Sequence, residues 1–211
     1  MHIPDGFLSP VVWVPLYLVS IAVVGYSVKR ANKRLGERHI PLMGVLAAFV
    51  FAAQMLNFPV AGGTSGHLLG GVLVAVLVGP FAGTIVMTVI FVVQAIVFQD
   101  GGITALGANI FNMGMIGTIL GYYIYVTIRK IIKEDRGILV GAFVASWIAM
   151  VLGAIFVAVE LAISGTSPIE IALPAMALIH GVTGIGEGFI TVAVIGYILK
   201  VRPDILEVEK I

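Results

Sequence analysis

Residues 7–28, FLSPVVWVPLYLVSIAVVGYSV, form an apolar stretch without a charged side chain. A helix of roughly 20 apolar residues crosses the hydrocarbon core of a membrane, so this stretch is predicted to be a membrane span. Because Lys and Arg concentrate on the cytoplasmic side, the basic cluster that follows predicts a span that begins outside and ends inside. The cluster consists of Lys29, Arg30, Lys33, Arg34 and Arg38.

The composition of the whole chain agrees with a membrane protein. Of its 211 residues, 60% are hydrophobic and only 11% are charged, which lies far outside the range of soluble globular domains. The formal net charge of +1 gives no reason to expect nucleic acid as a partner, and membrane lipid is the expected environment. The absence of cysteine excludes disulfides, thiolate metal sites and a cysteine nucleophile.

Six more apolar segments follow the first, and all seven are predicted to be helices of a single membrane domain that covers residues 1–211. One of them, residues 68–78, is too short to cross a membrane alone and is predicted to be a short third span that Pro80 closes. The expected fold is an all-α integral membrane protein with seven transmembrane helices. They are 7–28, 40–58, 68–78, 81–98, 108–128, 138–159 and 171–199.

The distribution of charge supports this topology. With seven spans and the N-terminus outside, all 12 Lys and Arg residues fall inside, in 29–38, 129–136 and 200–210. The C-terminus is then cytoplasmic, and the chain is predicted to be a multi-pass protein of the cell (cytoplasmic) membrane. Residues 1–6 contain Asp5 but no Lys or Arg, whereas a secretory signal needs a basic leading region. Met1 is therefore expected to be retained and to lie outside.

Small residues four positions apart recur along the spans. Such pairs let two helices approach closely within a membrane. They predict either packing inside the bundle or a face for another membrane subunit, and the sequence leaves both open. The pairs are Ala48 with Ala52, Gly79 with Gly83, Gly117 with Gly121, and Ala154 with Ala158.

The segment 57–67, NFPVAGGTSGH, is irregular by composition and leads into the short third span. Irregular backbone at membrane depth is tolerated where it lines a cavity, so His67 is expected at the floor of an outward-facing pocket. His67 is interpreted either as a residue that caps the helix or as a metal ligand. The positive end of the helix dipole disfavours a cation, so a metal here needs further donors, preferably anionic ones.

Met1 and His2 can supply such donors. A free α-amine, the main-chain nitrogen of residue 2 and the imidazole of residue 2 close two fused chelate rings once the amide loses its proton. Ni²⁺ and Cu²⁺ drive that loss because both favour square-planar nitrogen coordination. One more nitrogen completes the plane, and His67 is a candidate. The competing interpretation is that His2 is an exposed residue near a chain end.

Three motifs point to a known family: MHIPDGFL at 1–8, GGTSGH at 62–67 and HGVTGIGEG at 180–188. Together they resemble the NikM/CbiM family, the substrate-capture (S) components of nickel and cobalt energy-coupling-factor (ECF) transporters. The resemblance implies the S-component fold with an extra N-terminal helix. It also implies metal ligands at Met1, His2 and His67. Pro4 and the expected lack of a leader favour the nickel branch, NikM.

The resemblance also implies how the chain divides the work of transport with partner subunits. The chain would capture Ni²⁺, or Co²⁺, outside the cell, and partner subunits of an ABC transporter would power the uptake. No Lys follows a Gly in the sequence, so the Gly-Lys-Ser/Thr phosphate-binding motif is absent and the chain is not expected to be the ATPase. The implied partners are a transmembrane coupling subunit, cytoplasmic ATPase subunits and a small accessory membrane subunit. Neither a prosthetic group nor an enzymatic activity is expected.

Further polar residues are candidates for supporting roles. His180 and Glu187 are seven positions apart, hence on one face of the last span, and mark either a buried polar contact or a transport pathway. Asp5, Thr64 and Ser65 are expected to orient the metal ligands. Interior hydrogen-bonding groups are expected at Gln54, Asn57, Gln94, Asn109 and Asn112.

Two other functions compete with metal capture. A self-contained, proton-coupled divalent metal permease would use His180 and Glu187 as relay groups. An intramembrane metalloenzyme is a weaker alternative, because the sequence lacks a His-Glu-x-x-His pattern. Four nitrogens in one plane also leave little room for an activated water, so no residue is expected to be catalytic.

Overall fold

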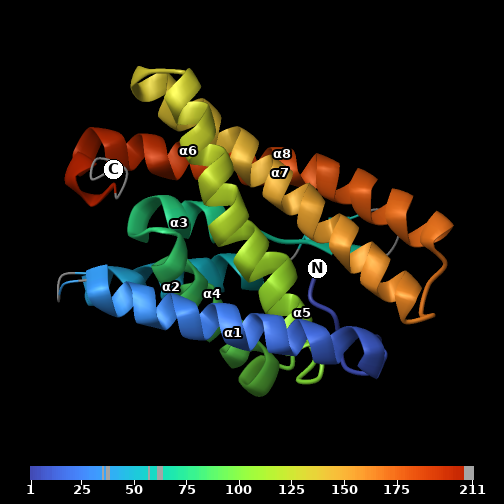
Figure 1. Cartoon of the computed structure of the whole chain (residues 1–211). Helices are drawn as coiled ribbons and strands as arrows, with labels where there is room; N and C mark the ends of the chain where they lie inside the picture. The colour runs from blue at the N-terminus through green and yellow to red at the C-terminus, as the bar shows by residue number, and fades with distance from the viewer. Residues whose placement is uncertain (35, 37–38, 57, 61–63, 207–211) are drawn as a thin grey trace.

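The computed structural model describes residues 1–34, 36, 39–56, 58–60 and 64–206, and most of them are helical (Figure 1). In chain order the α-helices are α1 (Pro10–Arg34), α2 (His39–Met55), α3 (Gly71–Val78), α4 (Pro80–Val93), α5 (Leu106–Asn109), α6 (Gly121–Ile131), α7 (Glu134–Ile163) and α8 (Ile169–Val201). The π-helical segment η1 (Gln94–Phe98) continues α4, η2 (Ile110–Leu120) joins α5 to α6, and the 3₁₀ turn η3 (Pro203–Ile205) follows α8. Two short strands, β1 (Phe58–Val60) and β2 (Thr64–Gly66), pair antiparallel.

Helix α3 lies at the centre of the molecule. All eight of its residues are buried, and it packs against α2, α4, α6, α7 and α8. Gly70 and Gly79 flank it with φ angles of 77° and 84°, which glycine adopts readily because it has no Cβ. Pro80 then begins α4, where its missing N–H leaves no helical hydrogen bond unmade. The helix is shorter than the predicted span 68–78, because residues 67–70 are irregular.

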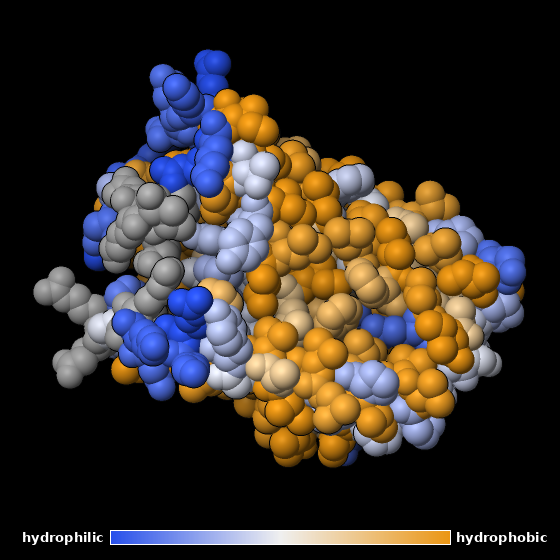
Figure 2. All heavy atoms as spheres, viewed as in Figure 1, coloured by the Kyte–Doolittle hydropathy of each residue, from blue (hydrophilic) through white to orange (hydrophobic). Residues whose placement is uncertain are grey.

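The helices form a multi-pass membrane protein, as predicted. Within the described residues, five helical segments are long and apolar enough to cross a membrane: Pro10–Lys33, Pro80–Phe98, Leu106–Ile131, Glu134–Ile163 and Ile169–Val201. Helix α2 is apolar but has 17 residues, and α3 has eight, so the predicted count of seven spans stays a prediction. Figure 2 shows a broad belt of apolar side chains over the surface, as expected for contact with lipid.

The basic segments lie toward one end of the molecule. The C-terminal end of α1, the connection from α6 to α7 and the C-terminal end of α8 all point to the left in Figure 1. Figure 2 shows hydrophilic side chains gathered at that end. Arg129 and Lys130 in the last turn of α6, and Lys200 in the last turn of α8, belong to these segments. The arrangement agrees with the predicted common side of the Lys and Arg residues.

The segment between α2 and α3 is more regular than the sequence predicts. Strands β1 and β2 form a hairpin in which Phe58 lies opposite Gly66 and Val60 opposite Thr64. Pairing satisfies main-chain hydrogen-bonding groups that irregular chain would leave open. Residues 57 and 61–63 of the predicted loop lie outside the described residues.

The predicted small-residue pairs divide between the interior and the surface. Ala154 and Ala158 are buried within the bundle. Gly117 lies against α3, where a Cβ on Gly117 would be 3.1 Å from the α3 backbone. These residues serve packing inside the molecule, whereas Ala48 and Ala52 are exposed on α2.

Candidate metal site

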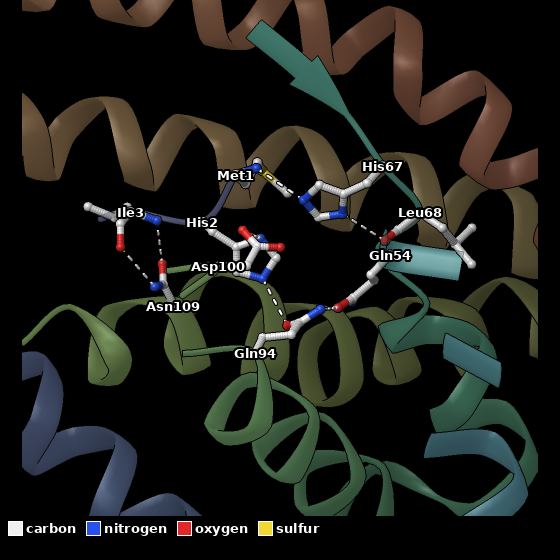
Figure 3. Close-up of polar contacts among 9 residues, drawn as sticks. All are labelled: Met1, His2, Ile3, Gln54, His67, Leu68, Gln94, Asp100 and Asn109. Carbon is white, nitrogen blue, oxygen red and sulfur yellow. Dashed lines mark hydrogen bonds and ion pairs between the residues drawn. The ribbon is translucent and has the colours of Figure 1, made fainter. Parts of the chain in front are cut away.

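Residues 1–9, which precede α1, fold back so that the chain begins near the middle of the molecule (Figure 1). The α-amine of Met1 lies 3.2 Å from Nε2 of His67. The ring of His2 stacks on the ring of His67, with the two centroids 5.0 Å apart. The structure therefore brings the three predicted ligand residues to one place (Figure 3).

Asn109, at the end of α5, holds the N-terminal segment. Its Oδ1 accepts a hydrogen bond of 2.9 Å from the N–H of Ile3, and its Nδ2 donates one of 3.1 Å to the Ile3 carbonyl (Figure 3). The N–H of Gly102 donates to the same carbonyl at 2.8 Å. Ile3 is buried, and both of its main-chain groups are satisfied. This fixes the chain directly after the two residues that carry the candidate ligands.

Asp5 fastens the N-terminal segment to the loop between η1 and α5. Its carboxylate accepts hydrogen bonds from the N–H of Ile103 at 3.0 Å, the N–H of Thr104 at 2.7 Å and the hydroxyl of Thr104 at 2.5 Å. These bonds, the one from the Thr104 hydroxyl first, lower the pKa of Asp5 below its usual value. The sequence predicts that Asp5 orients the ligands. In the structure its carboxylate binds this loop, so any such effect acts through the main chain.

Gly102 permits the close approach of this segment to the loop. A Cβ at position 102 would lie 2.6 Å from Oδ1 of Asp5 and 2.7 Å from the carbonyl carbon of Pro4. Such distances are far shorter than van der Waals contact, so no other residue fits without displacing the N-terminal segment. The site therefore depends on a glycine that carries no chemistry of its own.

The hydrogen bonds of His67 fix which ring nitrogen can bind a metal. Nδ1 lies 2.9 Å from the main-chain carbonyl of Leu68, which can only accept, so Nδ1 carries the ring proton. Nε2 then keeps its lone pair and faces the Met1 amine. A metal bound between Met1 and His67 would find this nitrogen ready to coordinate.

A relay of two buried glutamines fixes which ring nitrogen of His2 carries the proton and which is free to bind a metal (Figure 3). Nε2 of Gln54 donates to the carbonyl of Leu69 at 2.7 Å. Oε1 of Gln54 therefore accepts from Nε2 of Gln94 at 2.8 Å, and Oε1 of Gln94 accepts from Nε2 of His2 at 3.1 Å. Because the relay ends on a carbonyl, which has no hydrogen to give, every donor in it is assigned. Nδ1 of His2 is left with its lone pair.

Burial keeps the candidate nitrogen donors uncharged near neutral pH. It lowers the pKa of the Met1 α-amine to about 6. Burial, followed by the nearby charge of the amine, lowers the pKa of His2 to about 4 and places that of His67 well below its usual range. Uncharged amine and imidazole groups are the forms that bind a metal.

Glu187 and His180, the two ionisable residues predicted on the last span, make separate contacts. The carboxylate of Glu187 accepts hydrogen bonds from the N–H of Leu69 at 2.7 Å and of Gly70 at 2.9 Å. It thus offsets the positive end of α3, which the sequence predicts to be unfavourable for a cation. Nδ1 of His180 donates to the carbonyl of Met176 on its own helix at 2.8 Å. Both residues are buried polar contacts.

Two predicted side chains are not described by the structure, and one contact of His2 was not predicted. The side chains of Thr64 and Ser65 lie outside the described part of the structure. Asp100, to which the sequence analysis assigns no role, has Oδ1 3.4 Å from Nδ1 of His2. Its sequence signal is weak: the two glycines that follow it mark a turn, and nothing links it to residue 2. No group of three or more His, Asp or Glu side chains able to hold a metal occurs among the described residues.

Known proteins resemble the chain over nearly its whole length. Residues 2–205 match the family described as cobalt uptake substrate-specific transmembrane region, CbiM. A protein of Archaeoglobus fulgidus, named as a proposed fused nickel transport protein NikMN, is 44% identical over 98% of this chain and 68% of its own length. The fused nickel transport protein NikMN of Rhodobacter capsulatus is 33% identical over 98% of this chain and 64% of its own length.

A solved structure agrees with this relationship. The crystal structure of a truncated transition metal transporter matches the fold with a TM-score of 0.87 at 33% sequence identity, covering 95% of this chain and 99% of that chain. The family match and the apolar helices together define a membrane protein of nickel or cobalt transport. The resemblance predicted from the three sequence motifs is confirmed: the chain belongs to the CbiM family.

Proposed function

We propose that the chain captures Ni²⁺ outside the cell through four nitrogen atoms, with Co²⁺ as the second candidate. Three of the nitrogens belong to the beginning of the chain: the α-amine of Met1, the deprotonated main-chain nitrogen of His2 and Nδ1 of His2. The fourth is Nε2 of His67. The metal is cargo rather than a resident cofactor, so its capture must be reversible.

The distance between Met1 and His67 carries this proposal. In a square plane with metal–nitrogen bonds of about 2 Å, nitrogens at neighbouring corners lie about 2.8 Å apart. The Met1 amine and Nε2 of His67 are separated by 3.2 Å. A small movement of either group therefore closes one edge of the plane.

The tautomers of both histidines support the same arrangement. Nδ1 of His2 is the ring nitrogen that closes a six-membered chelate ring with the amide nitrogen of its own residue. The hydrogen bonds of the glutamine relay select the tautomer of His2 in which Nε2 carries the proton, and this Nδ1 is left free. The carbonyl of Leu68 leaves Nε2 of His67 free in the same way. Each ring thus presents the nitrogen that the chelate needs.

The choice of metal follows from the amide. Few divalent cations of biology displace an amide proton, whereas Ni²⁺ and Cu²⁺ do so because both favour square-planar nitrogen coordination. Two relatives are named for nickel, and the family is named for cobalt. Nickel is the metal that both the donor set and the names of these relatives support.

We also infer the membrane arrangement and the partners. Seven spans, with the N-terminus outside and the C-terminus cytoplasmic, are supported by the helical segments that coincide with the seven apolar stretches and by the basic segments toward one end. The chain then acts as the S component of an ECF-type ABC transporter. Its partners are the transmembrane coupling subunit, cytoplasmic ATPase subunits and a small accessory membrane subunit, and ATP hydrolysis belongs to those partners.

The contacts of Glu187 weaken the alternative of a proton-coupled permease. Both of its carboxylate oxygens already accept hydrogen bonds from main-chain amides. A relay group must exchange its proton during transport, which would break the cap on α3 in each cycle. Transport by the purified chain alone, driven by a proton gradient and abolished by Glu187→Ala, would overturn the capture model.

Titration of the purified chain with Ni²⁺ tests the proposed site. Addition of one alanine before Met1 moves the α-amine out of the plane and should abolish high-affinity binding, as should His2→Ala and His67→Ala. His39→Ala, at the start of α2 and outside the network of Figure 3, should bind as the original chain does. Thermal unfolding verifies that each variant is folded. Unchanged affinity in the extended chain would show that the chelate model is wrong.

A further inference from the structure

Asp100 lies beside the candidate chelate and is more exposed than His2, the residue that it contacts. Its side chain is 29% exposed, whereas that of His2 is only 6% exposed. Oδ1 of Asp100 lies 3.4 Å from Nδ1 of His2, the nitrogen that the glutamine relay leaves without a proton (Figure 3). A carboxylate at the solvent side of a buried lone pair stands where a cation would enter.

The position of Asp100 is built into the end of η1. The N–H of Asp100 donates to the main-chain carbonyl of Gln94 at 3.0 Å, and Gln99 between them adopts a left-handed conformation with φ of 55°. Gln94 therefore places both partners, His2 through its side chain and Asp100 through its carbonyl. A non-glycine residue at positive φ is costly and persists only where the surroundings hold it.

The contact between Asp100 and His2 has no bridging hydrogen in the tautomer that the relay sets. Nδ1 of His2 and Oδ1 of Asp100 are then both acceptors, and two acceptors at this distance repel each other. A divalent cation between them turns the repulsion into two attractive contacts. Since Gln94 already orients the ring, the carboxylate is not needed for that purpose.

We propose that Asp100 is the entry ligand of the site: its carboxylate binds the hydrated divalent cation first and passes it to Nδ1 of His2. The inference rests on the proposed capture function. A loaded plane with one deprotonated amide carries a net charge of +1, and the adjacent carboxylate brings the sum to zero. In a buried site this neutralisation is worth far more than in water. Carboxylate oxygen is also the kind of ligand that accepts a cation still carrying water.

The test measures the rate at which Ni²⁺ associates with the purified full chain, followed by the absorption of the nickel–nitrogen chromophore. Asp100→Ala is expected to lower the association rate constant about tenfold and to flatten its dependence on salt. Asp100→Asn is a second variant that keeps the shape of the side chain. Asp100→Glu restores the charge and should recover part of the rate. Glu170→Gln removes an exposed acidic group at the start of α8 and should leave the rate unchanged.

Two further measurements distinguish a role of Asp100 in metal entry from a role in shaping the final metal site. The absorption band of the final complex should be the same in Asp100→Ala, because the carboxylate is not part of the nitrogen plane. The ¹⁵N shifts of His2 in the metal-free chain should still report a proton on Nε2. An unchanged association rate, a shifted absorption band or a changed tautomer would each overturn the proposal. If the extended chain fails to bind while Asp100→Ala associates normally, the capture site stands and the entry ligand alone is wrong.

Discussion

The carboxylate of Glu187 on α8 accepts a hydrogen bond of 2.9 Å from the main-chain N–H of Gly70, at the start of α3. Its second oxygen accepts one of 2.7 Å from Leu69. Glu187→Gln is expected to lower the free energy of unfolding by about 2 kcal/mol, because its amide nitrogen must face one of two main-chain donors and leave it unpaired. Thermal or denaturant unfolding in detergent measures the loss.

The matched control for that change is Glu170→Gln, which alters the same functional group at an exposed position of α8. It should leave stability within experimental error. Affinity for Ni²⁺ should fall in Glu187→Gln because His67 lies two residues before Leu69, the first of the two capped residues. Equal stability of the two variants would mean that the cap contributes nothing.

Gly102→Ala tests the close contact between the loop and the N-terminal segment. The added Cβ would lie 2.6 Å from Oδ1 of Asp5, and relief of such a contact typically costs about 1–3 kcal/mol. If the N-terminal segment moves to relieve it, affinity for Ni²⁺ falls about tenfold for each 1.4 kcal/mol. Gly44→Ala, on α2, has nothing within 4 Å of the added Cβ and should bind normally. Isothermal titration of both variants with Ni²⁺ measures the two affinities, and equal values would mean that the close contact at Gly102 does not support the site.

Gln94→Met tests the relay that sets the tautomer of His2. The substitution keeps the length of the side chain but removes the acceptor for Nε2 of His2 and the donor to Gln54. Partners of this kind are typically worth about 10–100-fold in metal affinity, and a loss of that size is expected. ¹⁵N NMR of labelled histidine should show His2 divided between two tautomers. Thr88→Val, which removes a hydrogen bond confined to α4, should change neither measurement.

The sequence indicates the residues that we propose as metal ligands because their chemistry is local, and their role as ligands stays a prediction. Met1 and His2 are adjacent, so their chelate follows from covalent geometry alone, and His67 stood out as an ionisable residue beside a short apolar segment. The apolar stretches also predicted the helices, because lipid requires long uninterrupted runs. Each of these signals lies within one short segment, whereas the family resemblance needed three separate motifs.

The contacts that orient those residues could not be predicted, because each joins segments far apart in the chain. Gln94 and Gln54 were predicted only as interior polar groups, and their order in the relay depends on the carbonyl of Leu69. The contact between Asp100 and His2 exists only because the end of η1 brings Asp100 beside the folded-back N-terminal segment. No pattern in either segment predicts such a pairing, because it is set by how the helices pack.

Protons released on binding test the buried state of the amine. Burial lowers the pKa of Met1 to about 6 and that of His2 to about 4, so both groups bind few protons at pH 7. The His2 amide is then the main source, and about one proton should leave for each Ni²⁺ bound at pH 7. At pH 5 the amine is mostly protonated, and the number should rise to about two. Affinity therefore falls as the pH is lowered, more steeply below pH 6.

An exposed amine would release a different number of protons for each Ni²⁺ bound at pH 7, so this number distinguishes a buried amine from an exposed one. Its pKa near 8 would leave it protonated at pH 7, so about two protons would be released there. Titration calorimetry in buffers of different ionisation enthalpy gives the number directly. No release at pH 7 would mean that the amide keeps its proton and that the plane of four nitrogens does not form. Release of two would mean that burial beside His67 does not lower the pKa of the Met1 amine.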